Sequence, residues 1–127
     1  MTTENKNLHR AGEDYLEAIL ILKNRLSVVR SIDVADYMGF SKASVSYAVS
    51  ALQSGGFLTR ESGGELCLTD IGEKVAEKIY ARHCFFMEKL VAAGVDPETA
   101  NLEACRMEHA ISTDSFEKLK KHGGDSL

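Results

Sequence analysis

The sequence predicts a mainly α-helical fold with a small β-hairpin wing, in which a winged helix-turn-helix domain is followed by an all-helical domain. Two observations carry this prediction. Residues 12–55 show the periodicity of three helices, and two short β-type segments then flank a glycine-rich turn. From residue 70 onward, apolar residues recur at helical spacing. We therefore place the domain boundary at residue 70, between residues 1–70 and residues 71–127.

The first three predicted helices follow one another closely. Residues 12–25 form the first and residues 31–38 form the second, which Gly39 ends. Ser41 caps the third helix, which runs to about residue 55. A tight turn that contains a glycine is typical of a helix-turn-helix. The third helix has a predicted buried stripe at spacings of four and three residues, formed by Val45, Val49 and Leu52.

The predicted wing follows at once. Residues 57–61 and 65–69 are expected to form short strands, because Ser62-Gly63-Gly64 between them is a hairpin signal. Three helices followed by a hairpin is the element order of a winged helix.

The second half is predicted to be helical throughout. One helix covers 70–93, a second covers 97–111 and a third ends near residue 122, before a tail at 123–127 that is expected to fray. Asp96 followed by Pro97 is a typical start of a helix, and Ser112 caps the last one. The first two of these helices are expected to form a homodimer, because the long helix offers more apolar surface than a monomer needs, at Phe85, Phe86, Met87 and Leu90.

The composition limits the class of protein. The chain has 127 residues, of which 44% are hydrophobic, so a core can form without disulfides. It has no run of 18 apolar residues, which predicts no transmembrane helix, and its first residues lack the apolar stretch of a signal peptide. We expect a cytoplasmic protein that does not enter a membrane.

The charge is distributed unevenly. A net charge of −4 argues against a nonspecific polyanion binder, but no acidic residue lies between Asp36 and Glu61, a stretch that contains Lys42 and Arg60. The third predicted helix lies in this stretch, so its exposed face can approach DNA.

The face opposite the buried stripe carries the candidate DNA contacts. They are Ser41, Lys42, Ala43, Ser44 and Tyr47, with Arg60 on the wing. Small and hydroxylated side chains allow close approach to phosphates and base edges. The helix face has no Arg, Asn or Gln, so we expect backbone and shape readout more than a dense direct code. A merely solvated polar face is the alternative, and the adjacent wing favours double-stranded DNA.

The cysteines do not indicate a disulfide framework. Cys67, Cys84 and Cys105 are an odd number and form no Cys-x-x-Cys pair, which also excludes a zinc finger. We expect Cys67 and Cys84 to be small buried hydrophobes.

Residues of the types that bind metals occur in three places. Asp14 and Glu17 are three residues apart on one helix face, and His83 lies in the long helix. Cys105, with Glu108 and His109 three and four residues later, would present thiolate, carboxylate and imidazole on one helix face. Mixed oxygen, nitrogen and sulfur ligation suits Mn, Fe, Co, Ni or Zn.

Each of these groups also has a structural interpretation. The pair of acids could simply stabilise a helix N-terminus, and a lone histidine on an apolar stripe is commonly a core residue. Cys105 could belong to the core, with Glu108 and His109 at the surface. Residues alone leave these alternatives open.

Two motifs resemble a known family. Glu-Asp-Tyr-Leu-Glu at 13–17 and Glu-Ala-Cys-Arg-Met-Glu-His-Ala-Ile-Ser at 103–112 are similar to motifs of the diphtheria-toxin-repressor family of iron- and manganese-dependent regulators. The resemblance extends from Glu13 to about Leu119. It implies a DNA-binding domain over 1–70, a helical metal-binding and dimerisation domain over 71–127, and a homodimer on operator DNA. It also implies Fe(II) or Mn(II) ligands at Asp14, Glu17, His83, Cys105, Glu108 and His109.

The sequence departs from both branches of that family. Iron-type members have Met at the position of Asp14, and manganese-type members have Glu at the position of Cys105, so the predicted site is a hybrid. The iron type's ancillary metal site needs a carboxylate where this chain has Met87 and a histidine where it has Asn101. We also expect the short form of the family, without an SH3-like domain.

The resulting expectation is a divalent-metal-activated repressor of metal-ion homeostasis genes, and not an enzyme. The main alternative is a winged-helix regulator that senses a non-metal ligand. A small metal hydrolase is disfavoured because every candidate general base is already assigned as a ligand. A dimeric interaction module without a DNA role is disfavoured by the face formed by residues 41–47.

Overall fold

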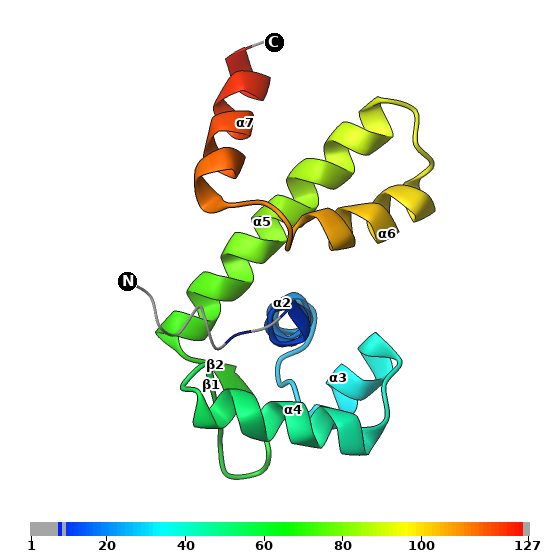
Figure 1. The fold of residues 1–127 in the computed structure, drawn as a ribbon. Helices are drawn as coiled ribbons and strands as arrows, with labels where there is room; N and C mark the ends of the chain where they lie inside the picture. Colours follow the sequence, from blue (N-terminus) through cyan, green and yellow to red (C-terminus); the bar gives the residue numbers. More distant parts are fainter. Residues whose placement is uncertain (1–7, 9, 126–127) are drawn as a thin grey trace. The chain divides into compact units, whose positions relative to one another are not determined.

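A computed structural model of the chain describes residue 8 and residues 10–125. It forms two compact units, which divide between Glu77 and Lys78 (Figure 1). The elements in chain order are α2 (Arg10–Lys23), α3 (Ser31–Met38), α4 (Lys42–Ser54), β1 (Leu58–Arg60), β2 (Leu66–Leu68), α5 (Asp70–Ala92), α6 (Pro97–Met107) and α7 (Thr113–Asp125). The division therefore falls inside α5. In the described part of the chain, no helix is long and apolar enough to cross a membrane.

The first unit has one apolar core. Within it, α2 contacts both α3 and α4, and Figure 1 shows α2 end-on above α4. The predicted stripe of α4 is buried, with Val45 and Val49 completely inaccessible, and Leu16 and Ile19 face it from α2. The elements of this unit thus contribute to the interior through the spacings that the sequence predicted.

The helix-turn-helix is held by local hydrogen bonds. The side chain of Asp33 accepts the backbone N–H of Arg30 at 2.8 Å at the start of α3. Gly39 ends α3 with a φ of 72°, a left-handed conformation that favours glycine. Ser41 then caps α4 by accepting the backbone N–H of Ser44 at 3.1 Å, which confirms the predicted cap.

The wing is a two-stranded antiparallel hairpin in which Leu58 pairs with Leu68 and Arg60 with Leu66. The strands are three residues each, shorter than predicted, although the Glu61 N–H still donates to the Glu65 carbonyl beyond them. Gly63 and Gly64 form the tip with φ of 94° and 90°. The pairing weakens there because the chain has already begun to turn.

The start of α5 is fitted closely to the wing. Thr69 donates its hydroxyl to the Gly56 carbonyl at 2.7 Å and accepts the backbone N–H of Gly72 at 3.1 Å. A Cβ at position 72 would overlap the carbonyl of Phe57. Glycine is therefore required by close approach of two backbones and not by its φ.

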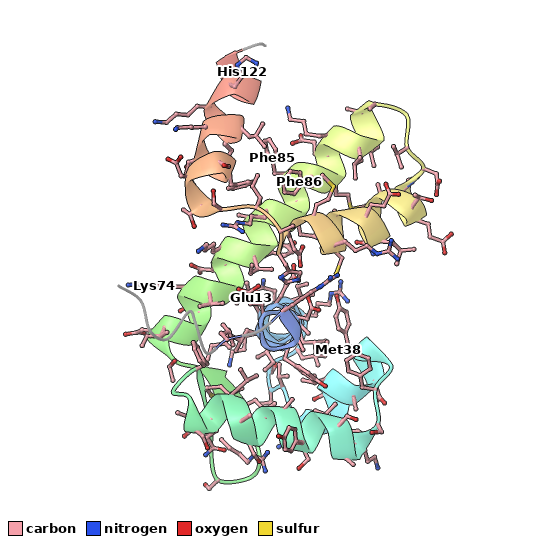
Figure 2. The ribbon with its side chains drawn as sticks, viewed as in Figure 1. Glu13, Met38, Lys74, Phe85, Phe86 and His122 are labelled. Carbon is pink, nitrogen blue, oxygen red and sulfur yellow. The ribbon has the colours of Figure 1, made fainter. Side chains whose placement is uncertain are left out.

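The second unit consists of the later part of α5 with α6 and α7. Its core holds Phe86, Ala104 and Phe116, and Phe85 stacks edge-on against Phe116 with ring centroids 5.3 Å apart. Figure 2 shows Phe85 and Phe86 on α5, in the region between α5 and α7. Because these two aromatic rings occupy the packed face, Cys84 is exposed, and the prediction that it is buried was wrong.

Two helix ends in this unit differ from the prediction. Helix α6 ends at Met107 and not at Ile111, because the guanidinium of Arg82 takes the carbonyl of Glu108 at 3.0 Å and that of Ile111 at 2.7 Å. Helix α7 begins after the predicted Ser112 cap but continues to Asp125, through a segment expected to fray. Glycine disfavours a helix by only about 1 kcal/mol per residue, so a pair of glycines does not have to end one. Residues 126–127 lie outside the described part.

Candidate metal centre and DNA-reading face

Glu108 is the centre of the candidate metal site in the second unit. Its side chain is fully buried. One carboxylate oxygen, Oε1, lies 2.9 Å from Nδ1 of His83, and the other, Oε2, lies 3.2 Å from Nε2 of His109. The two oxygens of a single carboxylate therefore each contact a different imidazole.

Cys105 joins this group from the last turns of α6. The candidate ligand atoms of Cys105, Glu108 and His109 lie within 4.8 Å of one another. Glu108 follows the last residue of the helix but keeps helical torsions, φ −62° and ψ −23°, so its spacing from Cys105 is still that of neighbouring turns. His109 comes from the turn after the helix, and the prediction that all three lie on one helix face was wrong for this residue.

His83 is held on both sides of its ring. Nδ1 contacts Glu108, and Nε2, the other ring nitrogen, lies 2.8 Å from the side-chain oxygen of Asn101, on α6. The sequence singles out Asn101 only as a position at which the iron-type pattern has a histidine. A contact between residues 18 positions apart, on two different helices, leaves no periodic signal in the sequence.

Arg82 fixes the segment that carries Glu108 and His109. Its guanidinium donates to the carbonyls of Glu108 and Ile111 and, at 3.2 Å, to the hydroxyl of Thr113. The same group lies 5.5 Å from the centre of the Phe116 ring. This buried arginine was also missed, since one basic residue beside a candidate ligand is no signal by itself.

Asp14 and Glu17 both lie on α2, three residues apart and on one face. They belong to the first unit, whereas His83, Cys105, Glu108 and His109 belong to the second. That the six residues bind the same metal centre stays a prediction.

The donors in the second unit fit a divalent transition metal. A buried carboxylate is costly unless a positive charge or hydrogen bonds compensate it. Two imidazoles and a thiol surround this one, and that mixed set suits Fe(II), Mn(II), Co(II) or Zn(II). Glu108 can serve two neighbouring donor sets, one with Cys105 and His109 and one with His83.

All six candidate DNA contacts are exposed on the first unit. Ser41, Lys42, Ala43 and Ser44 form the start of α4, Tyr47 follows one turn later with 80% of its surface exposed, and Arg60 ends β1. The Ser41 hydroxyl donates to that of Ser44 at 3.0 Å while also capping the helix. Ser41 is therefore partly used for structure.

The sequence matches two family descriptions over most of its length. Residues 7–64 match the iron dependent repressor, N-terminal DNA binding domain, and residues 69–125 match the iron dependent repressor, metal binding and dimerisation domain. An HTH-type transcriptional regulator of Methanocaldococcus jannaschii is 33% identical over 113 residues, which cover 85% of this chain and 88% of the relative. The transcriptional regulator MntR of Salmonella typhimurium is 32% identical over 115 residues, covering 87% and 73%.

Solved structures give the same picture. The manganese regulator SloR superimposes with a TM-score of 0.80 at 25% identity, over 89% of this chain and 53% of that one. A manganese-dependent transcriptional repressor in complex with manganese gives 0.78 at 25% identity, over 89% and 52%. This chain spans about half the length of both, and the likeness confirms the predicted winged helix followed by a helical domain.

Proposed function

Because this chain belongs to the iron-dependent repressor family, we propose that it is a homodimeric repressor that binds double-stranded operator DNA when Fe(II) or Mn(II) occupies its metal centre. Its targets are genes of metal-ion homeostasis, and it acts in the cytoplasm as a regulator and not as an enzyme. Residues 1–70 bind DNA, and residues 71–127 bind metal and dimerise. The observation that carries the proposal is the buried Glu108 carboxylate between His83 and His109.

Six residues would hold the metal. Cys105, His109 and one oxygen of Glu108 form one donor set, and His83 with the other oxygen forms a second. Asp14 and Glu17 add hard oxygen ligands from α2, a role supported by their spacing and by the family motif at 13–17. The bound ion supplies positive charge that compensates these carboxylates.

The ligand set would couple metal binding to DNA binding. Asp14 and Glu17 lie on a helix of the DNA-binding domain, whereas the other four ligands lie in the dimerisation domain. Ligands contributed by both domains restrict how α2, and α4 packed against it, can be placed. In a two-fold dimer this restriction sets the spacing of two α4 helices, which must reach major grooves about 34 Å apart. Thermodynamic linkage makes the coupling reciprocal, so operator DNA should tighten metal binding.

The residues available for a dimer surface differ from those that were expected. The aromatic residues of α5 were expected to supply it, but Phe86 is buried and Phe85 packs inside the second unit. Exposed apolar side chains of the same unit, Leu102 at 59% and Val91 at 41%, remain for contact with a second copy. Sedimentation that shows only a monomer at micromolar concentration would contradict the dimer.

His109→Ala tests the metal centre. We expect operator binding by the variant to lose its response to added Mn(II) or Fe(II), because one imidazole ligand is gone, while the circular dichroism of the protein is retained. His122→Ala, which changes an exposed histidine of α7, is the matched control. Fluorescence anisotropy of labelled operator DNA, titrated anaerobically with each metal, measures the effect. A fully metal-responsive His109→Ala variant would show that the site is misassigned.

Cys105→Glu tests the preference between the two metals. The thiolate is the softer ligand and favours Fe(II), so the wild type should respond to Fe(II) at a lower concentration than to Mn(II). The substitution replaces sulfur by a hard oxygen and should move the ratio of activating concentrations toward Mn(II). An unchanged ratio would mean that Cys105 does not bind the metal.

One observation favours the alternative of a non-metal signal. An apolar groove of about 750 Å³ lies between α2 and α4, lined in part by Tyr15, Ala48 and Phe57, and it borders the DNA-reading face at Tyr47. Operator binding, measured with protein stripped of metal by a chelator, distinguishes a metal signal from a non-metal signal. Operator binding that survives chelation would exclude a metal at Glu108 as the required signal and leave the groove as the candidate regulatory site.

A further inference from the structure

We propose that Asn101 is a positioning residue of the metal centre: its side-chain oxygen accepts the Nε2–H of His83 and thereby directs Nδ1, the other ring nitrogen, at Glu108. The proposal rests on the proposed function, because it takes His83 as a metal ligand. It goes further in assigning a role to a residue that replaces a family ligand.

The geometry places His83 between two polar partners. Nε2 lies 2.8 Å from Oδ1 of Asn101, and Nδ1 lies 2.9 Å from Oε1 of Glu108. The side chain of His83 is only 17% exposed, so water has limited access to the ring. Contacts at both nitrogens fix the rotation of the imidazole, which a single contact would leave free to turn.

The chemistry of the amide decides which nitrogen can bind a metal. A neutral imidazole carries one ring proton, and only the nitrogen without it offers a lone pair. The carbonyl oxygen of Asn101 can accept a hydrogen bond but cannot donate one, so it favours the tautomer protonated at Nε2. Nδ1 is then the nitrogen available for a metal beside Glu108. Without the metal, the Glu108 carboxylate is also an acceptor, 2.9 Å away, and calls for a proton on Nδ1, which a bound ion would replace. Such a hydrogen-bonded partner of a ligating histidine commonly raises metal affinity.

The opposite orientation of the amide makes the proposal testable. If Asn101 donated its NH₂ group to Nε2 instead, the ring proton would sit on Nδ1 and block the metal-binding position. The two arrangements differ at Nε2 in the metal-free protein: this nitrogen carries a proton when the amide oxygen faces it and none when the NH₂ group does. Protonation at Nε2 is therefore a readout that a merely structural role of Asn101 would not fix.

The position of Asn101 also defines what the Nε2 side of the ring does. In the iron-type pattern described above, this position carries a histidine ligand and position 87 a carboxylate, whereas this chain has Asn101 and Met87. Neither a carboxamide nor a thioether is a strong ligand for Fe(II) or Mn(II). The Nε2 side is thus used to hold His83 and not to hold another ion.

The experiment uses the full-length chain, with Asn101→Ala, Asn101→Asp and the control Glu103→Ala, an exposed residue of the same helix. Long-range ¹H–¹⁵N NMR of the metal-free protein reports the ring tautomers. We expect His83 to be protonated at Nε2 in the wild type, in Asn101→Asp and in the control. Asn101→Ala should leave Nε2 only partly protonated and give a 10- to 100-fold loss of Mn(II) affinity, on the order found for such partners of metal ligands. Asn101→Asp retains an acceptor and should keep the affinity near that of the wild type.

Two results would overturn the inference: a wild-type His83 without a proton at Nε2, or an Asn101→Ala variant with unchanged protonation at Nε2 and unchanged Mn(II) affinity. His83→Ala separates this failure from failure of the proposed function. If His83→Ala weakens Mn(II) binding while Asn101→Ala does not, only the positioning role is lost. If His83→Ala leaves Mn(II) binding unchanged, His83 is not a ligand, and the proposed site and the inference fall together.

Discussion

The interiors of the two units differ in kind. The core of the first unit is a single cluster of fourteen buried residues, apolar apart from the hydroxyl of Tyr15, drawn from its helices and its hairpin. The corresponding cluster of the second unit has three buried members, Phe86, Ala104 and Phe116. Two ionisable side chains, Arg82 and Glu108, are buried in the second unit, against one, Glu17 on α2, in the first. Apolar burial therefore stabilises the DNA-binding unit, whereas polar contacts carry more of the organisation of the other.

This contrast suits the two tasks. A reader of DNA must present α4 in one fixed shape, which a close-packed apolar core provides. A sensor must gain stability from its signal, and a ligand can add only as much as its preference for the folded, closed state. Because the core of the second unit is small and surrounds a buried carboxylate, a bound metal can add to its stability. The gain in the free energy of unfolding is about 2.7 kcal/mol when the free metal is at 100 times its Kd.

The largest expected effect is a loss of stability in the first unit, which has the apolar core. Leu66 on β2 is completely buried in the cluster, so Leu66→Ala should lower the free energy of unfolding by about 2–5 kcal/mol, since it removes apolar contacts and leaves a cavity. Lys74→Ala, on the exposed surface of α5, is the control. Hydrogen exchange resolved along the chain measures the change. If protection were lost equally in residues 78–125, the two units would unfold together and the contrast between them would be without consequence for stability.

The second prediction breaks the polar unit. Arg82→Met removes the donors to the carbonyls of Glu108 and Ile111 and should cost about 1–3 kcal/mol, because those buried acceptors lose their partner. It should also reduce the rise in melting temperature on adding Mn(II), since the turn that carries His109 is released. Arg82→Lys keeps the charge but not the planar fork, and is expected to be intermediate. A metal-induced rise equal to that of the wild type would show that Arg82 does not support the metal centre.

The same contrast explains how far the sequence could be interpreted. In the first unit the buried stripe of α4, its Ser41 cap and the Gly39 turn were predicted because each depends on neighbours only a few residues away. The order of elements, and with it the winged helix, followed from those local signals. The lengths of the strands were overestimated, where hairpin pairing ends gradually, and the first helix lies at Arg10–Lys23 and not at 12–25. Cys67, expected to be buried, is only partly buried.

In the second unit the decisive contacts join residues far apart in the chain. Arg82 captures the Glu108 carbonyl 26 positions away and so ends α6 four residues before the predicted end. Phe85 packs on Phe116, which redirects an expected dimer surface into the core. The candidate ligands themselves were found from their chemical types and a family motif. Their mutual arrangement, and the role of Asn101, required the structure.

A third prediction concerns the exposed DNA-reading face of the first unit, compared with the exposed surface of the second. Lys42 is exposed at the start of α4, where no acidic residue is near in sequence. Lys42→Ala should weaken binding to all DNA sequences and reduce the slope of log K against log salt by about one, the value for one lost phosphate contact. Lys118→Ala, on α7 of the second unit, should leave the slope unchanged. Equal slopes for wild type and Lys42→Ala would mean that Lys42 contacts no phosphate.

The smallest expected effect lies at the start of α6, the helix that carries Asn101 and Cys105. Asp96 caps this helix, and the hydrogen bonds that its carboxylate accepts from Thr99, chiefly the backbone N–H, hold the pKa of Asp96 below its ordinary value of 3.8. A carboxyl group whose pKa is lower in the folded state stabilises that state above the unfolded pKa, and this contribution is lost as the pH falls through the folded pKa. Asp96→Asn retains a capping oxygen but cannot titrate.

The stability of wild type minus that of Asp96→Asn should therefore be constant near neutral pH and decrease once the pH falls below about 4. Urea midpoints measured for both proteins between pH 7 and pH 3 give this difference, in which the other carboxylates cancel. Because the cap belongs to the second unit, hydrogen exchange at low pH should show the loss in α6 and not in α4. A difference that is flat with pH would mean that the carboxylate of Asp96 gains nothing over an amide as a cap.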